Sequence, residues 1–276
     1  GGVVMRGGGV FGAAVAFAVG IVVGCLGLAP SLAGSADSRV AGLSTAVAQA
    51  RGELEVTRAQ LRSADSVVLD VGRETLAGTL AERSVMVVYA GGARDADVTK
   101  VRGLLADAGA RDAGSMRLRE AFFTPAMKNI ASNVLPAGAT LSEDKLDVGT
   151  HAGEILGSLV FHSSATDEER ASGLGTLRNA GFLTYGDGGV KPADAVVLIV
   201  GPDVPTEFLT RFAPALGSRG GGLVVAGDTG SAQLAALQGR VVTVDSIDRA
   251  TGQFAVVRQV ALLVPPNDPN SVGDAE

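Results

Sequence analysis

The stretch SVMVVYA, residues Ser84–Ala90, is continuously apolar and rich in β-branched side chains, as expected of a short buried strand. Gly91-Gly92 follows as a turn, and Asp95–Ala108 then carries apolar residues at helical spacing. The same order recurs downstream. Further strands are predicted at Ala195–Val200 (AVVLIV), Gly222–Ala226 (GLVVA) and Val241–Val244. Further helices are predicted over Pro205–Leu216, Ser231–Leu237 and Gln253–Leu263.

Strands without polar alternation, each followed by a helix, are typical of a parallel sheet covered on both faces. The sequence therefore predicts a doubly wound, Rossmann-like α/β domain over residues 81–265. Helices over 125–134, His151–Phe161 and a segment ending near Ala180 form an insert between its halves. Thr166 and Glu169 have the spacing of a capping box at the start of that third helix. The tail 266–276 lacks apolar residues and is predicted to be disordered.

The N-terminal segment contains twenty residues without a charge, Val10–Ala29. An α-helix needs about 20 apolar residues to cross a bilayer, so residues 1–36 are predicted to form a membrane anchor and a short linker. A cleaved signal peptide with Arg6 as its basic region is the alternative. Gly20 and Gly24 form a GxxxG pair that lets two membrane helices approach closely. The single basic residue before the helix favours a single-pass protein whose bulk is extracytoplasmic.

Residues 37–80 are predicted to form a coiled-coil helix, because apolar residues recur there at alternating steps of three and four. Charged side chains such as Arg51, Glu53 and Arg58 occupy the other faces. A homodimer is expected through this stripe, whose members include Val40, Leu43, Val47, Leu54 and Leu61. A single amphipathic helix that lies on the following domain is the alternative.

Composition and motifs argue against several classes of function. The net charge is −6 and basic residues form no cluster, which makes nucleic acid an improbable partner. The one cysteine, Cys25, lies in the predicted anchor, so the compartment cannot be inferred from disulfides. Turns after the strands, at 91–95, 201–203 and 227–231, contain no GxGxxG, P-loop or GxSxG motif. We therefore expect no enzyme, although a small-ligand receptor or an enzyme that uses these turns remains an alternative.

Two further interpretations concern polar residues of the turn 227–231 and of the segment 144–154. In the third turn, Asp228 or Thr229 is expected to cap the next helix rather than to help bind an anion. Asp147, His151 and Glu154, together with Asp144, are three or four residues apart and could share a helical face that holds a metal ion. A solvated polar face is the favoured interpretation, because Gly149-Thr150 is expected to interrupt the helix. No Cys or Met cluster suits copper, so no cofactor is predicted.

Three stretches resemble the actinobacterial MctB-like family, described as copper-transport outer-membrane proteins. They are AVGIVVG (18–24), VLPAG (134–138) and TLRNAGFLTY (176–185), and the likeness follows the same order through nearly the whole chain. The resemblance implies a cell-envelope protein of copper transport or homeostasis. The family also includes proteins similar to SteB, a cell-separation factor that works with the membrane protein SteA.

These observations leave two interpretations of the role. In the first, the chain is a membrane-anchored, non-enzymatic and dimeric scaffold that serves copper transport or homeostasis. In the second, it is a SteB-like cell-separation factor that binds a SteA-like membrane partner through the coiled coil or the α/β head. Although the family is described as outer-membrane, the short apolar strands of this sequence alternate with helices, which is not the pattern of a transmembrane β-barrel.

Overall fold

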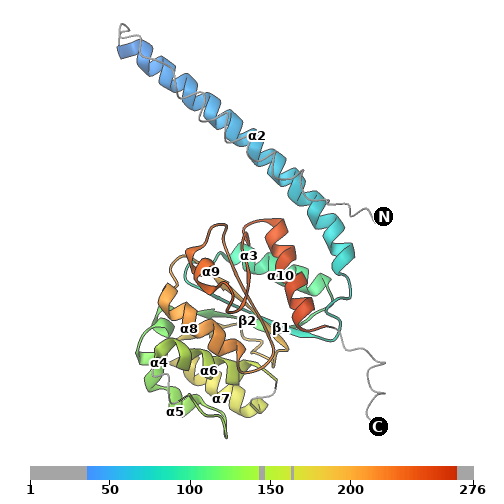
Figure 1. Ribbon diagram of the computed structural model, residues 1–276, viewed down its shortest axis with the longest axis vertical. Coiled ribbons are helices and arrows are strands. Elements are labelled where there is room, and N and C mark those ends of the chain that lie inside the picture. Colours follow the sequence, from blue (N-terminus) through green and yellow to red (C-terminus); the bar gives the residue numbers. More distant parts are fainter. Residues whose placement is uncertain (1–35, 143–146, 163–164, 266–276) are drawn as a thin grey trace, which may run out of the picture. The chain divides into compact units, whose positions relative to one another are not determined.

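The computed structural model describes residues 36–142, 147–162 and 165–265. The chain divides into two compact units, Gly1–Gln60 and Leu61–Glu276. The long helix α2, Ala36–Leu76, begins in the first unit and ends in the second (Figure 1). Within the described ranges, no helix has both the length and the hydropathy needed to cross a membrane. The predicted anchor, with its Gly20 and Gly24 pair, and the tail 266–276 lie outside these ranges.

The second unit contains a six-stranded sheet of order β3-β2-β1-β4-β5-β6. Its strands are β1 (Ser84–Ala90), β2 (Arg111–Leu118), β3 (Leu183–Tyr185), β4 (Ala195–Val200), β5 (Gly222–Gly227) and β6 (Val242–Val244). Neighbouring strands are parallel except β2 and β3. The expected α/β fold with a mostly parallel sheet is therefore confirmed.

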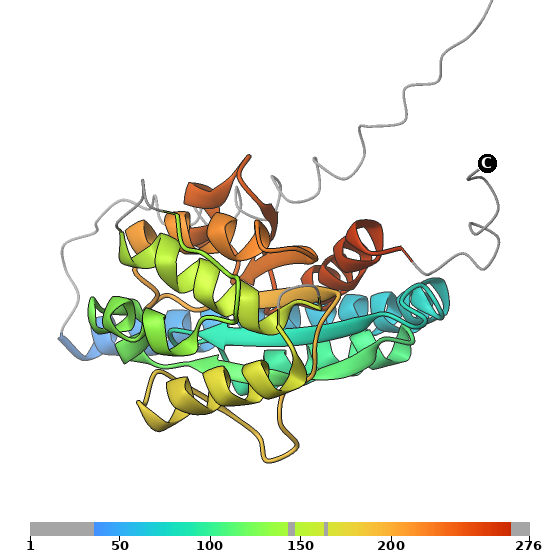
Figure 2. The same ribbon diagram turned by 90° about the horizontal axis from the view of Figure 1, so that it is seen from below.

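Helices cover both faces of the sheet (Figure 2). In chain order after α2 they are α3 (Asp95–Asp107), the 3-10 helix η1 (Glu120–Phe123), α4 (Ala126–Asn129), α5 (Ala131–Val134), α6 (Val148–Val160), α7 (Asp167–Asn179), α8 (Thr206–Gly217), α9 (Ala232–Leu237) and α10 (Ala250–Leu263). Successive side chains of a strand point to opposite faces. Val85 and Val87 accordingly pack in one core with α3, α10 and the end of α2, whereas Met86 and Val88 pack in the other core with the insert helices and α8.

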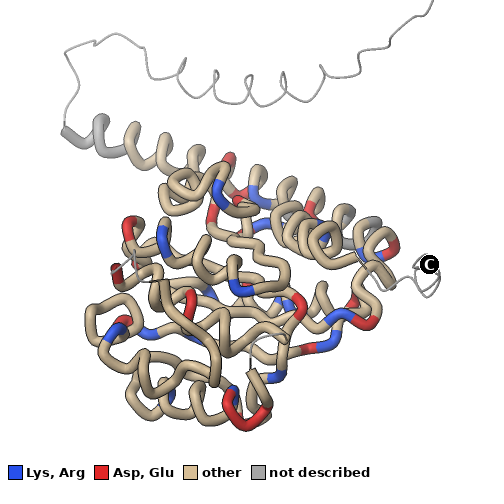
Figure 3. The backbone as a smooth tube through the Cα atoms, turned by 60° about the horizontal axis from the view of Figure 1, so that its bottom comes forward, with Lys and Arg blue, Asp and Glu red and all other residues tan. Residues whose placement is uncertain are grey.

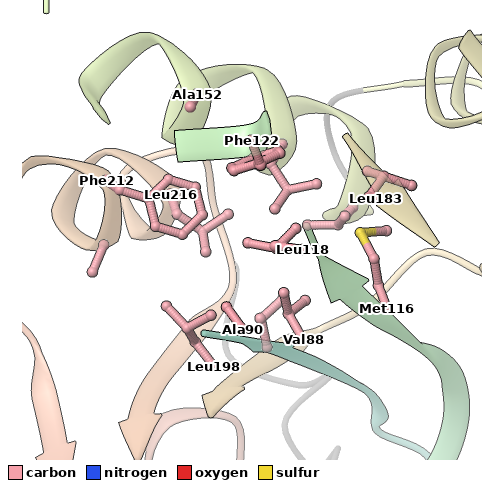
Figure 4. Close-up of a cluster of buried hydrophobic side chains, with 14 of the residues drawn as sticks. Val88, Ala90, Met116, Leu118, Phe122, Ala152, Leu183, Leu198, Phe212 and Leu216 are labelled. Atoms are coloured by element: carbon pink, nitrogen blue, oxygen red, sulfur yellow. The ribbon is translucent and has the colours of Figure 1, made fainter. Parts of the chain in front are cut away.

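The larger core lies between the sheet and the helices η1, α6 and α8 (Figure 4). Phe122 is completely buried there, and its ring meets the edge of the Phe212 ring with centroids 5.6 Å apart. Leu118 and Leu198 approach the same cluster from the sheet. Because η1 directly follows β2, this aromatic contact holds the end of β2 against α8.

Strands β2 and β3 were not predicted. The sequence of β2, RDAGSMRL, is polar, and only Ala113, Met116 and Leu118 have buried side chains. Its pairing with β1 shifts register between Val85 and Val87, close to Gly114 at φ 104°. This irregularity removes the clean period of two on which sequence-based prediction depends. The antiparallel edge strand β3 has three residues and carries too little pattern to be seen.

The insert helices differ from the expectation at two points. Helix α6 begins at Val148, so the predicted interruption at Gly149-Thr150 is wrong. Asp147 caps the helix by accepting hydrogen bonds from Thr150 N and Oγ1, both at 2.7 Å. The predicted helix over 125–134 is split into α4 and α5.

The capping box of α7 is confirmed. Thr166 Oγ1 accepts from Glu169 N at 3.2 Å, and Glu169 Oε2 accepts from Thr166 N at 2.9 Å. These reciprocal bonds satisfy two backbone donors at the start of the helix. The bond from Thr166 N also lowers the pKa of Glu169, together with a bond from Ala137 N, because hydrogen bonds to a carboxylate favour its charged form.

Glycines bring α6 and α8 into close contact. Gly149, Gly153 and Gly157 recur every four residues on α6, and a Cβ atom on any of them would lie within 3.0 Å of a backbone oxygen of α8. At Gly153 the distance to Phe212 O would be 2.4 Å. Small residues at this spacing let two helix backbones approach, here within the head.

Helix α2 is present as one element of 41 residues, in keeping with the helix predicted over 37–80. In the second unit, Val68 and Leu76 of its last turns pack in the core that also contains α3 and α10. Coiled-coil pairing of α2 with a second copy stays a prediction.

Candidate functional site

The carboxyl ends of β1 and β4 meet at the point where the strand order reverses. In open α/β sheets, ligands bind in the crevice at such a position. The turn after β4 is tied to the turn after β1, since Gly201 N donates to Ala90 O at 2.9 Å and Asp203 N donates to Gly91 O at 3.0 Å. Position 201 needs glycine, because a Cβ atom there would lie 2.1 Å from Gly91 O.

Beside these turns lies a cleft of about 670 Å³. Its walls come from the turn after β1, from the ends of β2 and η1, from Thr184 of β3 and from Asp203. Buried Ala90 and Leu118 and partly buried Phe123 contribute its apolar lining. Two of the three turns singled out in the sequence therefore belong to one concave site. The residues of β2 and η1 were missed, because β2 itself was not predicted.

Two arginines at this edge of the sheet are neutralised by the protein. Arg117 lies over the Tyr89 ring at 4.9 Å and forms an ion pair with Asp95. The neighbouring Tyr89 side chain, together with the hydrogen bond and the charge of Asp95, raises the pKa of Arg117. Arg94 binds Asp97 at 2.6 Å, which raises the pKa of Arg94.

The third turn, 227–231, is linked to this region by an ion pair. Arg94 reaches Asp228 at 3.3 Å. Asp228 therefore does not cap α9, and Thr229 instead bonds Ser246 and Asp248. The cap is Ser231, whose Oγ accepts from Leu234 N at 3.4 Å, so the expectation for Asp228 or Thr229 is wrong.

Three charged side chains of the cleft remain without such partners. Arg119, Glu120 and Asp203 form no side-chain hydrogen bond or ion pair with any residue in the described ranges. All three are exposed. Along the described backbone, basic and acidic residues are interspersed (Figure 3). The cleft thus offers both a free cation and free carboxylates to a ligand.

A serine, a histidine and an aspartate do meet, at the opposite end of β1. Ser84 Oγ lies 3.1 Å from His162 Nε2 and donates to Asp194 Oδ2 at 3.0 Å. Asp194 Oδ1 lies 3.8 Å from the same Nε2 atom. A nucleophilic triad needs the aspartate at the other ring nitrogen and the serine proton directed to histidine. Here the serine proton is held by the aspartate, so the arrangement lacks the geometry of an activated nucleophile.

Of the metal-ligand candidates, Asp144 lies outside the described residues, while Asp147 caps α6 and His151 and Glu154 lie on it. These three residues contact other protein groups. Glu154 is 5% exposed, accepts from Ser142 N at 3.0 Å and pairs with Arg219 at 3.3 Å. His151 Nε2 is 3.3 Å from Ser142 O. Burial alone would raise the pKa of Asp147, but the bonds from Thr150 and the charge of Arg211 outweigh it and lower the pKa.

A metal site is not assembled around these residues or elsewhere in the part of the chain that the structure describes. There, no three His, Cys, Asp or Glu side chains gather at a spacing that would hold a metal ion. Met86, Met116 and Met127 are completely buried in the core, away from any incoming ion. The described donor set therefore does not fit a copper centre.

The proposed oligomerisation residues lie on α2 or before it. Leu43, Val47, Leu54 and Leu61 are 66%, 47%, 47% and 41% exposed, which is unusual for apolar side chains on one helix. The side chain of Val40, like Gly20 and Gly24, lies outside the described residues.

Comparison with known proteins identifies the family. The family described as "Copper transport outer membrane protein, MctB" matches residues 10–262. The chain belongs to this family. A protein of Mycobacterium tuberculosis named "Copper transporter MctB" is 28% identical over 271 residues, which cover 88% of this chain and 86% of the relative. The protein of that name from Mycobacterium leprae is 29% identical over 215 residues, 67% of each chain.

The resemblance seen in the sequence is thus confirmed. MctB-family relatives are named for copper transport, and the family description places them at the outer membrane. The match extends from inside the predicted anchor into the last turn of α10, so it includes α2 and the whole sheet.

Proposed function

We propose that this chain takes part in copper handling at the cell envelope, as a membrane-anchored, non-enzymatic scaffold that pairs with a second copy. The family match over residues 10–262 carries the copper assignment. Two observations favour a scaffold over a copper carrier or an enzyme. The described side chains do not assemble a copper site, and the Ser84, His162 and Asp194 contact has the wrong geometry for catalysis.

The test is deletion of the gene in its own host, followed by measurement of cell-associated copper and of growth in added copper. We expect both to change and to be restored by the full chain. Unchanged copper content and growth would contradict the copper role. If such cells instead failed to separate after division, the SteB-like alternative would replace it.

Pairing through α2 is supported by its exposed apolar seam, defined as Leu43, Val47, Leu54 and Leu61. Val47, Leu54 and Leu61 are spaced seven residues apart, and Leu43 lies four before Val47. These are the a and d positions of a coiled coil, which a second helix buries by knobs-into-holes packing. On a helix without a partner, the same side chains remain in water.

Charges beside the seam favour a parallel pair in register. Glu53 precedes the a-position Leu54, and Arg58 follows the d-position Thr57. In a parallel dimer, each residue before an a position faces the residue five further along the other helix. Glu53 would then face Arg58 of the second copy, twice by symmetry. An antiparallel pair would not bring these two positions together in this way.

Cysteine cross-linking tests the pairing. In a Cys25→Ser background, the Leu54→Cys full chain is expected to form a disulfide-linked dimer on mild oxidation, because equivalent a positions of a parallel pair lie close enough for a disulfide. Val56→Cys is the matched control, since Val56 is 58% exposed but lies off the seam. Equal cross-linking of both variants, or of neither, on a denaturing gel would contradict the parallel seam.

A further inference from the structure

The cleft beside β1 contains Arg119, whose side chain, unlike that of nearly every other arginine in the head, has no hydrogen-bond or ion-pair partner in the described ranges. Of the thirteen arginines from Arg83 to Arg258, all within the described ranges, only Arg119 and Arg258 have no side-chain partner. Arg258 is an exposed residue of α10 and does not line the cleft, whereas Arg119 does. A guanidinium presents donors that match a carboxylate in a bidentate geometry.

Free carboxylates line the same cleft. Glu120 follows Arg119 as the first residue of η1, and Asp203 lies on the turn after β4. No described nitrogen of Arg119 comes within 4.0 Å of either carboxylate, since no such ion pair is formed. Charges of both signs therefore line this one cleft without forming an ion pair. A ligand with both signs could satisfy them together.

The balance of these charges decides the class of ligand. Arg117 is neutralised by Asp95, so the free groups are one cation and two carboxylates. A simple anion would be repelled by the two carboxylates, which outnumber the one free cation. A simple cation would be repelled by Arg119. We propose that the cleft binds a small zwitterion of the amino-acid or short-peptide class. Its carboxylate binds Arg119, and its ammonium binds Asp203 and Glu120.

Size and lining agree with this occupant. Small-molecule sites are concave, largely apolar and hold a few placed polar groups, within about 300–1,000 Å³. The cleft has about 670 Å³, an apolar floor at Ala90 and Leu118, and a partly exposed aromatic wall at Phe123. The interlocked turns after β1 and β4 fix Asp203 relative to that floor. The inference goes beyond the proposed scaffold role and does not depend on copper.

Thermal-shift screening of the full chain with each of the twenty free amino acids and with trialanine tests the proposal. At least one of these probes is expected to raise the unfolding temperature, because a ligand that binds only the folded state stabilises it. The N-acetylated and C-amidated forms of that probe, measured by titration calorimetry, should each bind about tenfold more weakly or worse, since each loses one charge-assisted contact.

Variants assign the contacts. Arg119→Gln should lower the affinity for the unmodified probe and make its free-acid and amidated forms bind equally well. Asp203→Asn should also lower that affinity and make the forms with a free and an acetylated amine bind equally well. Arg258→Gln is the matched control and should leave binding unchanged. The proposal is overturned if no probe binds, if acetylation and amidation have no effect, or if inorganic phosphate binds in place of the zwitterions.

Discussion

Replacing Gly153 by alanine is expected to lower the free energy of unfolding of the full chain by about 3 kcal/mol. The added methyl group would lie 2.4 Å from Phe212 O and 2.8 Å from Leu216 N. Both are backbone atoms of α8, so neither can move aside as a flexible side chain would. The two helices must separate, and the core around Phe122 and Phe212 loosens with them. Urea unfolding followed by circular dichroism measures the change.

Gly175 provides the matched control for this substitution. It lies within α7, and a Cβ atom added there would meet nothing within 4 Å. Gly175→Ala should therefore raise stability by roughly 0.5–1 kcal/mol, because alanine loses less backbone freedom in a helix than glycine does. If Gly153→Ala unfolded at the wild-type urea concentration, the close approach of α6 and α8 would be wrong.

Replacing Arg170 by methionine is expected to lower the free energy of unfolding by about 3 kcal/mol. The Arg170 side chain is 3% exposed and donates to Leu159 O at 2.8 Å, to Phe161 O at 3.3 Å and to Ala165 O at 3.2 Å. Two of these carbonyls lie at the C-terminal end of α6, where the helix leaves them without backbone donors. Methionine keeps much of the apolar stem but supplies no donor, so buried acceptors are left unpaired. Urea unfolding again gives the difference.

Arg178→Met is the control for the loss of an arginine from the same helix. Arg178 is 43% exposed, and its partner Asp187 is fully exposed at 3.6 Å. Pairs in water contribute about 0–1 kcal/mol, so this change should be small. Burial disfavours the charged guanidinium of Arg170 and lowers its pKa despite the nearby charge of Asp167, so the expected loss comes from the hydrogen bonds and not from the charge. Equal losses for both variants would show that Arg170 does not act through buried contacts.

Much of the head could be predicted because its strands are buried on both faces. β1, β4 and β5 read as unbroken apolar runs, and the helices after them carry a clear period. The Thr166 and Glu169 cap was equally visible, since it depends only on residues three apart. By contrast, β2 is polar and β3 is very short. The start of α6 at Val148 depends on the cap by Asp147, whereas the following Gly-Thr pair predicted an interruption of the helix.

The sequence by itself determined the local elements, the parallel α/β class and the family, because periodicity and residue order are properties of the chain. Only the tertiary structure decided which residues line the cleft. Arg119 directly follows β2, a strand that sequence patterns miss, and Asp203 comes from a turn 84 positions later. The tertiary structure also decided that Ser84 donates to Asp194, and that Glu154 is bound by Ser142 and Arg219. Contacts between distant residues arise from packing the two cores around the sheet, and no local spacing records them.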